Sequence, residues 1–150
     1  MFEFKEYPTL TDNEIDVSVE RTRPANSKIG WGPSYEFKIT LHGKDKKIGG
    51  ISLRVSNTEF IKLYAGHIGY GIEKNYRGHR YAAKACSLIR RVALDHGMRT
   101  LWITCNPDNI ASRRTCEIVG CKFVEIVDLS EDTDMYRRGE RQKCRYRWDI

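Results

Sequence analysis

The fold of this chain is set by residues 72–96, which read IEKNYRGHRYAAKACSLIRRVALDH. From position 80 to position 96 the apolar side chains recur every three or four residues, and charged side chains lie between them. That spacing places the apolar side chains on one face, so residues 80–96 are predicted to form a helix packed against a core. Gly97 follows directly, as expected of the glycine that ends a helix.

The residues before this helix favour strands. Residues 14–20 alternate apolar and polar side chains, as does a strand with one buried face. Residues 35–41 and 47–55 are strand-like on either side of a polar turn, which predicts a hairpin. Residues 64–72 predict a further strand, and residues 21–32 are rich in turn formers and predict a loop.

The residues after the helix alternate between the two kinds of element. The predicted elements are a strand at 100–105 buried on both faces, a helix at 110–119 with Asn109 as its N-cap, a strand at 122–129, a polar turn at 130–142 and a strand at 143–150. In the last strand, Arg145 and Arg147 are expected on the solvent face. This order predicts an α+β fold (an α/β mixed sheet), with a central mixed sheet flanked by helices and a right-handed parallel crossover.

Length and composition indicate one globular domain over residues 1–150. The chain has 40% hydrophobic and 31% charged residues, an ordinary balance that argues against wholesale disorder. No apolar run approaches the length of a membrane helix, and the first residues lack the basic start and apolar stretch of a signal peptide. We therefore expect a cytoplasmic protein without membrane association.

Cysteine and histidine spacing argues against a metal site. The chain has five cysteines and four histidines, with no CxxC pair and no cluster of ligand type. Reduced, mostly buried thiols are the interpretation we favour.

The charge balance favours an anionic partner. The formal net charge is +6, which attracts phosphates, nucleotides, nucleic acid or acidic proteins without distinguishing them. Residues 137–147 are dense in cations with interleaved tyrosines, so nucleic-acid binding is one interpretation. An exposed hairpin with arginines on its solvent face is the interpretation we favour, and a nucleic-acid partner is not expected.

The junction before the long helix has features of an anion site. A helix N-terminus offers unpaired N–H groups and the positive end of the helix dipole. Gly78 allows close backbone approach, and Arg77, His79 and Arg80 supply cationic donors. Neither a GxxxxGK[ST] loop nor a GxGxxG loop is present, and a solvated basic turn is the alternative.

Three stretches together give a more specific indication: HIGYGI at 67–72, YRGHRYAA at 76–83, and NPDNIAS at 106–112 followed by CEIVGCKF at 116–123. In their order and spacing the chain resembles the GNAT superfamily of acyl-CoA-dependent N-acetyltransferases, from about residue 47 to residue 123. Within it, the sequence is most similar to the branch that acetylates the N-terminal amines of ribosomal proteins. The resemblance implies acetyl-CoA as co-substrate and no metal.

The resemblance also implies a set of cofactor-binding residues. In the family's pyrophosphate pattern [QR]-x-x-G-x-[GA], Arg77 fills the first position and Ala82 the last, while Arg80 stands where the family has glycine. Backbone groups of the preceding strand would pair with pantetheine and hold the oxyanion. The implied residues are Tyr70, Gly71, Ile72, Arg77, Gly78, His79, Arg80, Tyr81, Ala82, Asn109 and Ser112.

Three residues are candidates for proton transfer. His67 lies where related sequences often have glutamate, and an ordinary histidine accepts protons near neutral pH. Glu73 is the second candidate base. Cys116 lies where many family members place a tyrosine that protonates the leaving thiolate. The alternatives are a histidine without a chemical role, a surface carboxylate and a packed core cysteine. No Cys–His pairing pattern supports a covalent acyl-cysteine route.

The expected function is transfer of an acetyl group from acetyl-CoA to a primary amine, by direct attack in a ternary complex. The acceptor is either a protein N-terminus or a small molecule. The alternatives are a CoA-binding regulatory module without catalysis and a basic nucleic-acid-binding protein. The two helices that the family places after its first strand look lost or reduced here. The acceptor side is therefore open, completed by another subunit in a homodimer, or lined by residues 130–142, with Trp31 and Tyr35 as further candidates.

Overall fold

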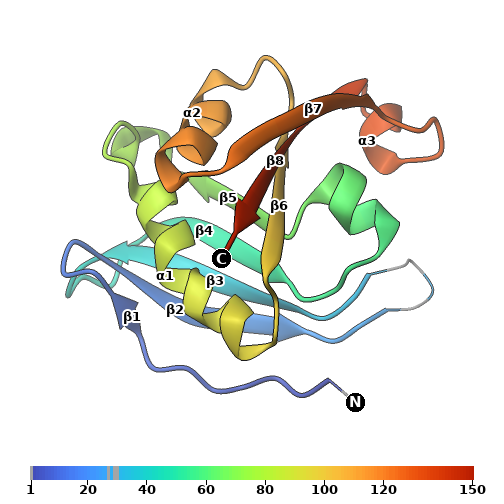
Figure 1. Ribbon diagram of the computed structural model, residues 1–150. Helices are drawn as coiled ribbons and strands as arrows, with labels where there is room; N and C mark the ends of the chain where they lie inside the picture. Colours follow the sequence, from blue (N-terminus) through green and yellow to red (C-terminus); the bar gives the residue numbers. More distant parts are fainter. Residues whose placement is uncertain (1, 27, 29–30) are drawn as a thin grey trace.

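The computed structural model describes residues 2–26, 28 and 31–150, which form two antiparallel sheets and the helices that cover them (Figure 1). The strands are β1 (Leu10–Thr11), β2 (Ile15–Arg23), β3 (Ser34–Leu41), β4 (Lys47–Arg54), β5 (Ile68–Ile72), β6 (Thr100–Cys105), β7 (Lys122–Asp128) and β8 (Gln142–Asp149). The helices are the π-helical turn η1 (Ile61–Ala65), the 3₁₀ turn η2 (Lys74–Tyr76), α1 (Tyr81–Asp95), α2 (Ile110–Val119) and α3 (Asp134–Arg137).

The first sheet has the strand order β1-β2-β3-β4-β5, with every neighbouring pair antiparallel. Its β3–β4 hairpin confirms the sequence prediction. The buried side chains of β3 include Tyr35, Phe37 and Ile39, and the residues between them face the other way. One face of this sheet therefore forms the core, and the opposite face carries polar side chains.

The second sheet has the order β6-β8-β7. It meets the first at the start of β5, where the backbone N–H of His67 donates to the carbonyl of Trp102 at 2.7 Å. Beyond that bond, no ladder joins β5 to β6 in the described part of the chain. The α+β class is confirmed. The strands form two antiparallel sheets that diverge from this point, where a single mixed sheet was expected.

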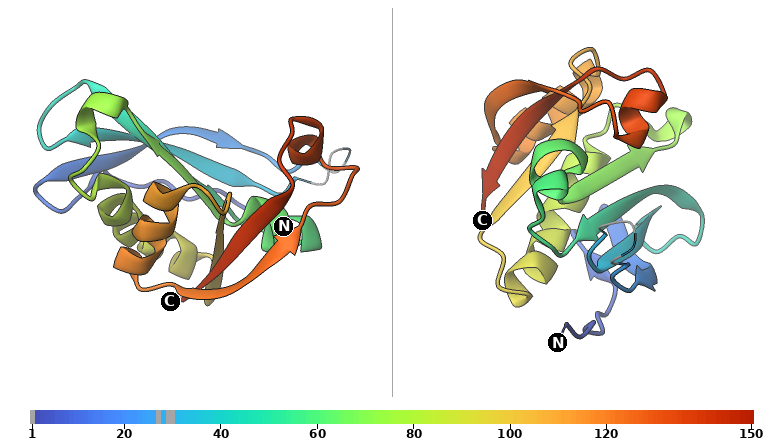
Figure 2. Two further views of the ribbon diagram at one scale, coloured as in Figure 1. Left: turned by 90° about the horizontal axis from the view of Figure 1, so that it is seen from above. Right: turned by 90° about the vertical axis from the view of Figure 1, so that its right-hand side faces the viewer.

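Both long helices lie on the same side of the first sheet (Figure 2, left). The periodic apolar residues of α1 account for this position, because Cys86, Ile89, Val92 and Ala93 are all fully buried. Helix α1 begins and ends within one residue of its predicted bounds, and α2 matches them. None of the helices in the described residues is long and apolar enough to cross a membrane.

Four local predictions need correction. The strand predicted at 64–72 begins only at Ile68, because η1 and the positive φ of Gly66 precede it. Strand β2 continues to Arg23 into the region expected to be loop, of which residues 27, 29 and 30 lie outside the described residues. Strand β6 is fully buried on one face only. The turn at 130–142 contains the short helix α3.

Arg145 is also placed differently from its prediction. Its side chain is buried, donates to the carbonyl of Lys62 at 3.0 Å and lies 4.0 Å over the Trp102 ring. Because η1 covers this face of the second sheet, only Arg147 of the two arginines is exposed as expected.

Candidate functional site

A cleft of about 520 Å³ lies between β5, the N-terminal end of α1 and α2. It contains every predicted cofactor-binding residue except His79, whose exposed ring stacks on Tyr81 with centroids 5.2 Å apart. The described residues that line it are Tyr70, Gly71, Ile72, Tyr76, Arg77, Gly78, Arg80, Tyr81, Ala82, Asn109, Ala111, Ser112, Arg114, Thr115 and Ile118. Side chains separated by up to about 50 positions in the sequence therefore meet in one site.

One wall of the cleft is the free edge of β5. The carbonyl of His67 accepts from the N–H of Arg54 at 2.7 Å, and the N–H of Glu73 donates to the carbonyl of Ile48 at 2.8 Å. Peptide groups alternate in direction along a strand, so the odd-numbered residues of β5 face β4. Tyr70 and Ile72 thus direct their N–H and C=O groups toward the free edge, whereas Gly71 pairs with β4.

The opposite wall is the start of α1, which has no capping side chain and no acidic residue in its first turn. The first N–H groups of a helix have no partner within the helix, and the dipole makes this end positive. Gly78 precedes it with φ +92°, and nothing lies within 4 Å of a side chain added there. The backbone at this end therefore offers donors to an anion without a competing carboxylate.

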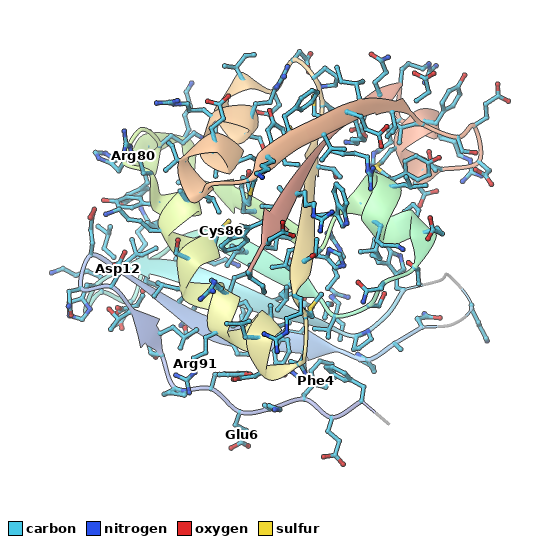
Figure 3. All side chains as sticks on the ribbon, in the orientation of Figure 1. Phe4, Glu6, Asp12, Arg80, Cys86 and Arg91 are labelled. Carbon is cyan, nitrogen blue, oxygen red and sulfur yellow. The ribbon has the colours of Figure 1, made fainter. Side chains whose placement is uncertain are left out.

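Arg80 adopts a conformation typical of glycine. Its φ and ψ are 63° and 23°, in the left-handed region, and it immediately precedes α1 (Figure 3). Glycine adopts this backbone conformation at little cost, and this chain instead has a cationic residue there, in the described lining of the cleft. The cost of a left-handed conformation for a residue with a Cβ is about 1 kcal/mol.

Arg77 links the loop to the strand edge. Its Nε donates to the carbonyl of Ile72 at 2.8 Å, one of the groups on the free edge of β5. Arg77 is exposed and is in the described lining of the same cleft.

The third wall is the start of α2. The Oδ1 of Asn109 accepts from the N–H of Ser112 at 3.1 Å, which confirms the predicted N-cap. This bond uses the carbonyl end of the amide only, so its NH₂ group remains available to a ligand.

The Tyr70 hydroxyl reaches α2 from β5. It lies 2.8 Å from Ser112 Oγ and 3.8 Å from Cys116 Sγ. Burial is the main cause that raises the pKa of Tyr70 above its ordinary value, so the phenol stays protonated. From the sequence, Tyr70 was predicted to act only through its backbone, because no spacing rule relates its hydroxyl to a helix 42 residues later.

Cys116 lies behind this tyrosine, fully buried. A hydrogen bond with Cys121 and burial raise the pKa of the Cys116 thiol far above its ordinary value. The described lining of the cleft does not include its side chain. Both groups therefore stay protonated, but of the two residues only Tyr70 is in the described lining of the cleft.

His67 lies at the point where the two sheets meet, outside the cleft lining. Its Nδ1 accepts from the N–H of Trp102 at 2.8 Å, so Nε2 bears the proton and donates to Asn57 Oδ1 at 3.0 Å. Burial lowers the pKa of His67 to about 4. Both ring nitrogens are therefore engaged, Nδ1 with β6 and Nε2 with the segment that follows β4.

Glu73 is exposed at the end of β5 and is likewise outside the lining. Among the described residues that line the cleft, none is aspartate, glutamate or histidine. The described part of the chain also contains no group of three His, Cys, Asp or Glu residues arranged to hold a metal ion. The described lining of the cleft therefore offers neither a carboxylate nor an imidazole as a base.

Tyr35, expected near the acceptor, is instead fully buried. Its hydroxyl bonds to the N–H of Lys5 at 2.8 Å and lies 2.7 Å from His96 Nε2, which ties the N-terminal segment to the end of α1. Trp31 does line a cleft, on the other face of the first sheet.

Comparison with known proteins gives one family. A sequence profile described as "Acetyltransferase (GNAT) domain" matches residues 2–122. No match was found among curated proteins.

Several solved structures share the fold. The ribosomal-protein-S5-alanine acetyltransferase from Vibrio fischeri has a TM-score of 0.69 at 12% identity, over 95% of this chain and 97% of that one. A probable GNAT-family acetyltransferase from Chromobacterium violaceum gives 0.66 at 12% identity, over 97% and 88%. The microcin C7 self-immunity acetyltransferase MccE, in complex with acetyl-CoA and AMP, gives 0.61 at 20% identity and 78% of this chain, which spans only 61% of that protein.

Proposed function

This chain belongs to the acetyltransferase (GNAT) domain family, and on that basis we propose that it transfers the acetyl group of acetyl-CoA to a primary amine. One observation supports this most directly: the free edge of β5 and the uncapped start of α1 face the same cleft. Such a site offers backbone donors and acceptors to an extended chain and a positive end to its diphosphate.

The proposed binding mode uses groups from all three walls. The first N–H groups of α1 bind the diphosphate of acetyl-CoA together with the guanidinium groups of Arg77 and Arg80. Tyr70 and Ile72 pair with the pantetheine arm through their outward-facing peptide groups, and the Asn109 amide donates to it from α2. Acetyl-CoA supplies the activated thioester.

The chemistry assigned to the chain is modest. An outward N–H of β5 stabilises the negative charge that develops on the carbonyl oxygen when the amine attacks. The hydroxyl of Tyr70 holds the proton that the departing sulfur requires, and Ser112 orients that hydroxyl. Because His67 is fully engaged and no carboxylate lies in the described lining, that part of the cleft supplies no base to the amine.

The lack of a base favours an acceptor whose amine is partly neutral near pH 7.5. An α-amino group has a pKa of about 8 and a lysine side chain about 10.4, so their neutral fractions differ by roughly 100-fold. We therefore propose an α-amino group as acceptor. The ribosomal-protein acetyltransferase among the similar structures is consistent with this choice.

The test compares two peptides of identical sequence. One has a free N-terminus and a blocked lysine, and the other has a blocked N-terminus and a free lysine. Acetyl transfer is followed by release of free CoA thiol and located by mass spectrometry. We expect kcat/KM to be roughly 100-fold higher for the α-amino peptide at pH 7.5.

Equal rates would overturn the α-amino assignment and leave the transferase in place. If calorimetry showed acetyl-CoA binding but no amine were acetylated, the regulatory alternative would replace it. If acetyl-CoA did not bind at millimolar concentration, the proposed cofactor cleft would be wrong.

A further inference from the structure

A second and larger cleft, of about 800 Å³, lies on the face of the first sheet opposite its buried residues. We call it the outer cleft. Its described lining is Arg21, Thr22, Arg23, Pro24, Ala25, Asn26, Lys28, Trp31, Gly32, Ser34, Glu36, Ser52 and Arg54. These residues include four cations and a single carboxylate, a strong local excess of positive charge.

Two of the cations are held side by side by that carboxylate. The Nε atoms of Arg21 and Arg23 both donate to the same oxygen, Glu36 Oε2, at 2.7 and 2.8 Å. Burial opposes ionisation of Glu36, but hydrogen bonds and charges from both arginines outweigh it and lower the pKa of this carboxyl. One negative charge is shared by two guanidinium groups, whose terminal nitrogens have no hydrogen-bond partner among the described residues.

A β-bulge produces this arrangement. Ile15, Val17 and Val19 alternate toward the core, and continued alternation would turn positions 21 and 23 inward as well. The register of β2 shifts between Val19 and Arg21, so that Arg21 pairs with Glu36 on the outer face. Bulges often re-aim side chains beside functional sites, and this one places two arginines in a cleft.

The outer cleft adjoins the strand that we assign to the cofactor. Arg54 lines it, stacks on Trp31 at 5.3 Å and donates to the carbonyls of Ala65 and Gly66, just before β5. Its Nη2 lies 3.4 Å from the position that a Cβ on Gly69 would take, on the side of β5 opposite Tyr70. Arg54 therefore relates the outer cleft to the face of β5 opposite Tyr70, although no residue of β5 itself is in the described lining.

We propose that the outer cleft binds an anionic acceptor, an amine accompanied by carboxylate or phosphate groups. Arg21 and Arg23 bind those groups, and Arg54, which stacks on Trp31, connects the cleft to the segment just before β5. The assignment of the outer cleft as an acceptor site rests on the proposed acetyl transfer. Paired guanidinium groups with free terminal nitrogens match the geometry of carboxylate and phosphate oxygens. Two kinds of acceptor have this chemistry: an acidic peptide with a free N-terminus, and a small phosphorylated amine.

The binding experiment separates this site from the transferase activity. A fluorescent octapeptide with an N-terminal alanine followed by aspartates and glutamates is titrated by anisotropy, beside a counterpart with asparagines and glutamines. Phosphoethanolamine and ethanolamine form the small-molecule arm, as competitors of the labelled acidic peptide. The R21Q/R23Q double variant removes the pair, R21K/R23K keeps its charge, and R91Q/R99Q removes two exposed arginines on and just beyond α1.

We expect the acidic peptide to bind at least about tenfold more tightly than the neutral one, and R21Q/R23Q to abolish that difference. R91Q/R99Q should bind like the wild type, and R21K/R23K should retain part of the affinity. If phosphoethanolamine displaces the labelled peptide at a concentration below the Kd of that peptide, the anion is a small phosphorylated amine. If it does not, the anion is an acidic peptide. Acetyl-CoA calorimetry and circular dichroism establish that each variant is folded.

The outcomes distinguish the two proposals. The outer-cleft proposal is overturned if the acidic and neutral peptides bind equally, or if R91Q/R99Q loses as much affinity for the acidic peptide as R21Q/R23Q does. In either case, acetylation of the neutral peptide would leave the transferase proposal intact. Arginine-dependent binding of the acidic probe supports the anion site even if no peptide is acetylated, and in that case the proposed transfer fails by itself.

Discussion

Arg80 combines a cationic side chain with a backbone conformation that glycine adopts at little cost. Replacing Arg80 by glycine should raise the free energy of unfolding by about 1 kcal/mol, because it relieves the left-handed strain. The same change should weaken acetyl-CoA binding severalfold, since it removes a donor to the diphosphate. Urea unfolding and calorimetry measure the two effects.

Arg77→Gly provides the matched control, because Arg77 has φ −76°. Glycine there relieves no strain and adds conformational freedom to the unfolded chain, so that variant should lose stability. A stability gain in both variants, or in neither, would contradict the assignment of strain to Arg80.

Tyr70 and Cys116 compete for the role of proton donor to the departing sulfur. Tyr70→Phe keeps the ring and removes the hydroxyl, so we expect kcat to fall about tenfold or more with little change in the KM for acetyl-CoA. Cys116→Ala should lower stability by about 1 kcal/mol through the cavity it leaves, with kcat within a few-fold of the wild type. Steady-state kinetics on both variants decides, and the reverse pattern would return the role to the thiol.

His67 should make stability depend on pH in a defined window. In the unfolded chain His67 binds a proton below about pH 6.5, whereas in the folded chain it binds one only below about pH 4. Unfolding therefore takes up a proton in this window, and the contribution of neutral His67 to stability is present above pH 6.5 and is lost as the pH falls. The loss approaches 1.4 kcal/mol per pH unit, or roughly 3 kcal/mol in total.

The measurement for His67 is a comparison with His67→Asn by urea unfolding between pH 7.5 and 4.5. Other titrating groups are common to both proteins and cancel in the difference. The stability advantage of the wild type should shrink as the pH falls, and a constant difference would show that folding leaves the pKa of His67 unchanged.

At the scale of elements, Asn109 caps α2, and we propose that it also donates to acetyl-CoA. Aspartate caps a helix as well as asparagine does, but its side chain has no N–H to donate. Asn109→Asp should therefore keep the stability within about 0.5 kcal/mol and raise the KM for acetyl-CoA. Asn109→Ala should lose about 1 kcal/mol of stability and show the same rise in KM. Thermal unfolding and steady-state kinetics separate the two roles; an unchanged KM in both variants would leave Asn109 with the cap alone.

The predictability of the elements follows from how local their signals are. Helices α1 and α2 were predictable because apolar spacing, Asn109 and the terminal glycines are all local features. The loop residues of the cofactor cleft were predictable from the motif at 76–83. The bulge in β2 could not be predicted, because the register shift depends on pairing with β3 and the alternation up to Val19 gives no sign of it. The hydroxyl of Tyr70 and the locking of His67 depend on contacts across 42 and 35 positions, which only the assembled fold provides.

The whole molecule consists of two sheets joined at one edge, with α1 and α2 packed near the line where they part (Figure 2). His67 and Trp102 connect the sheets at the start of β5, and no ladder connects them farther along in the described residues. A ligand that pairs with β5 would therefore complete a part of the fold that is open in its absence. Such a ligand stabilises the folded state by about 2.7 kcal/mol at a concentration 100 times its Kd.

Hydrogen exchange tests this arrangement at the level of single amides. Tyr70 and Ile72 direct their N–H groups to the free edge, so they should exchange rapidly in the free protein, whereas the N–H of Gly71, which pairs with β4, should be protected. Saturating acetyl-CoA should slow exchange at Tyr70 and Ile72 by at least about tenfold and leave Gly71 nearly unchanged. NMR-detected exchange resolves the three positions. If all three slowed equally, the ligand would be acting through global stability, and if Tyr70 and Ile72 were already protected without it, the two sheets would be paired in solution and the cleft closed.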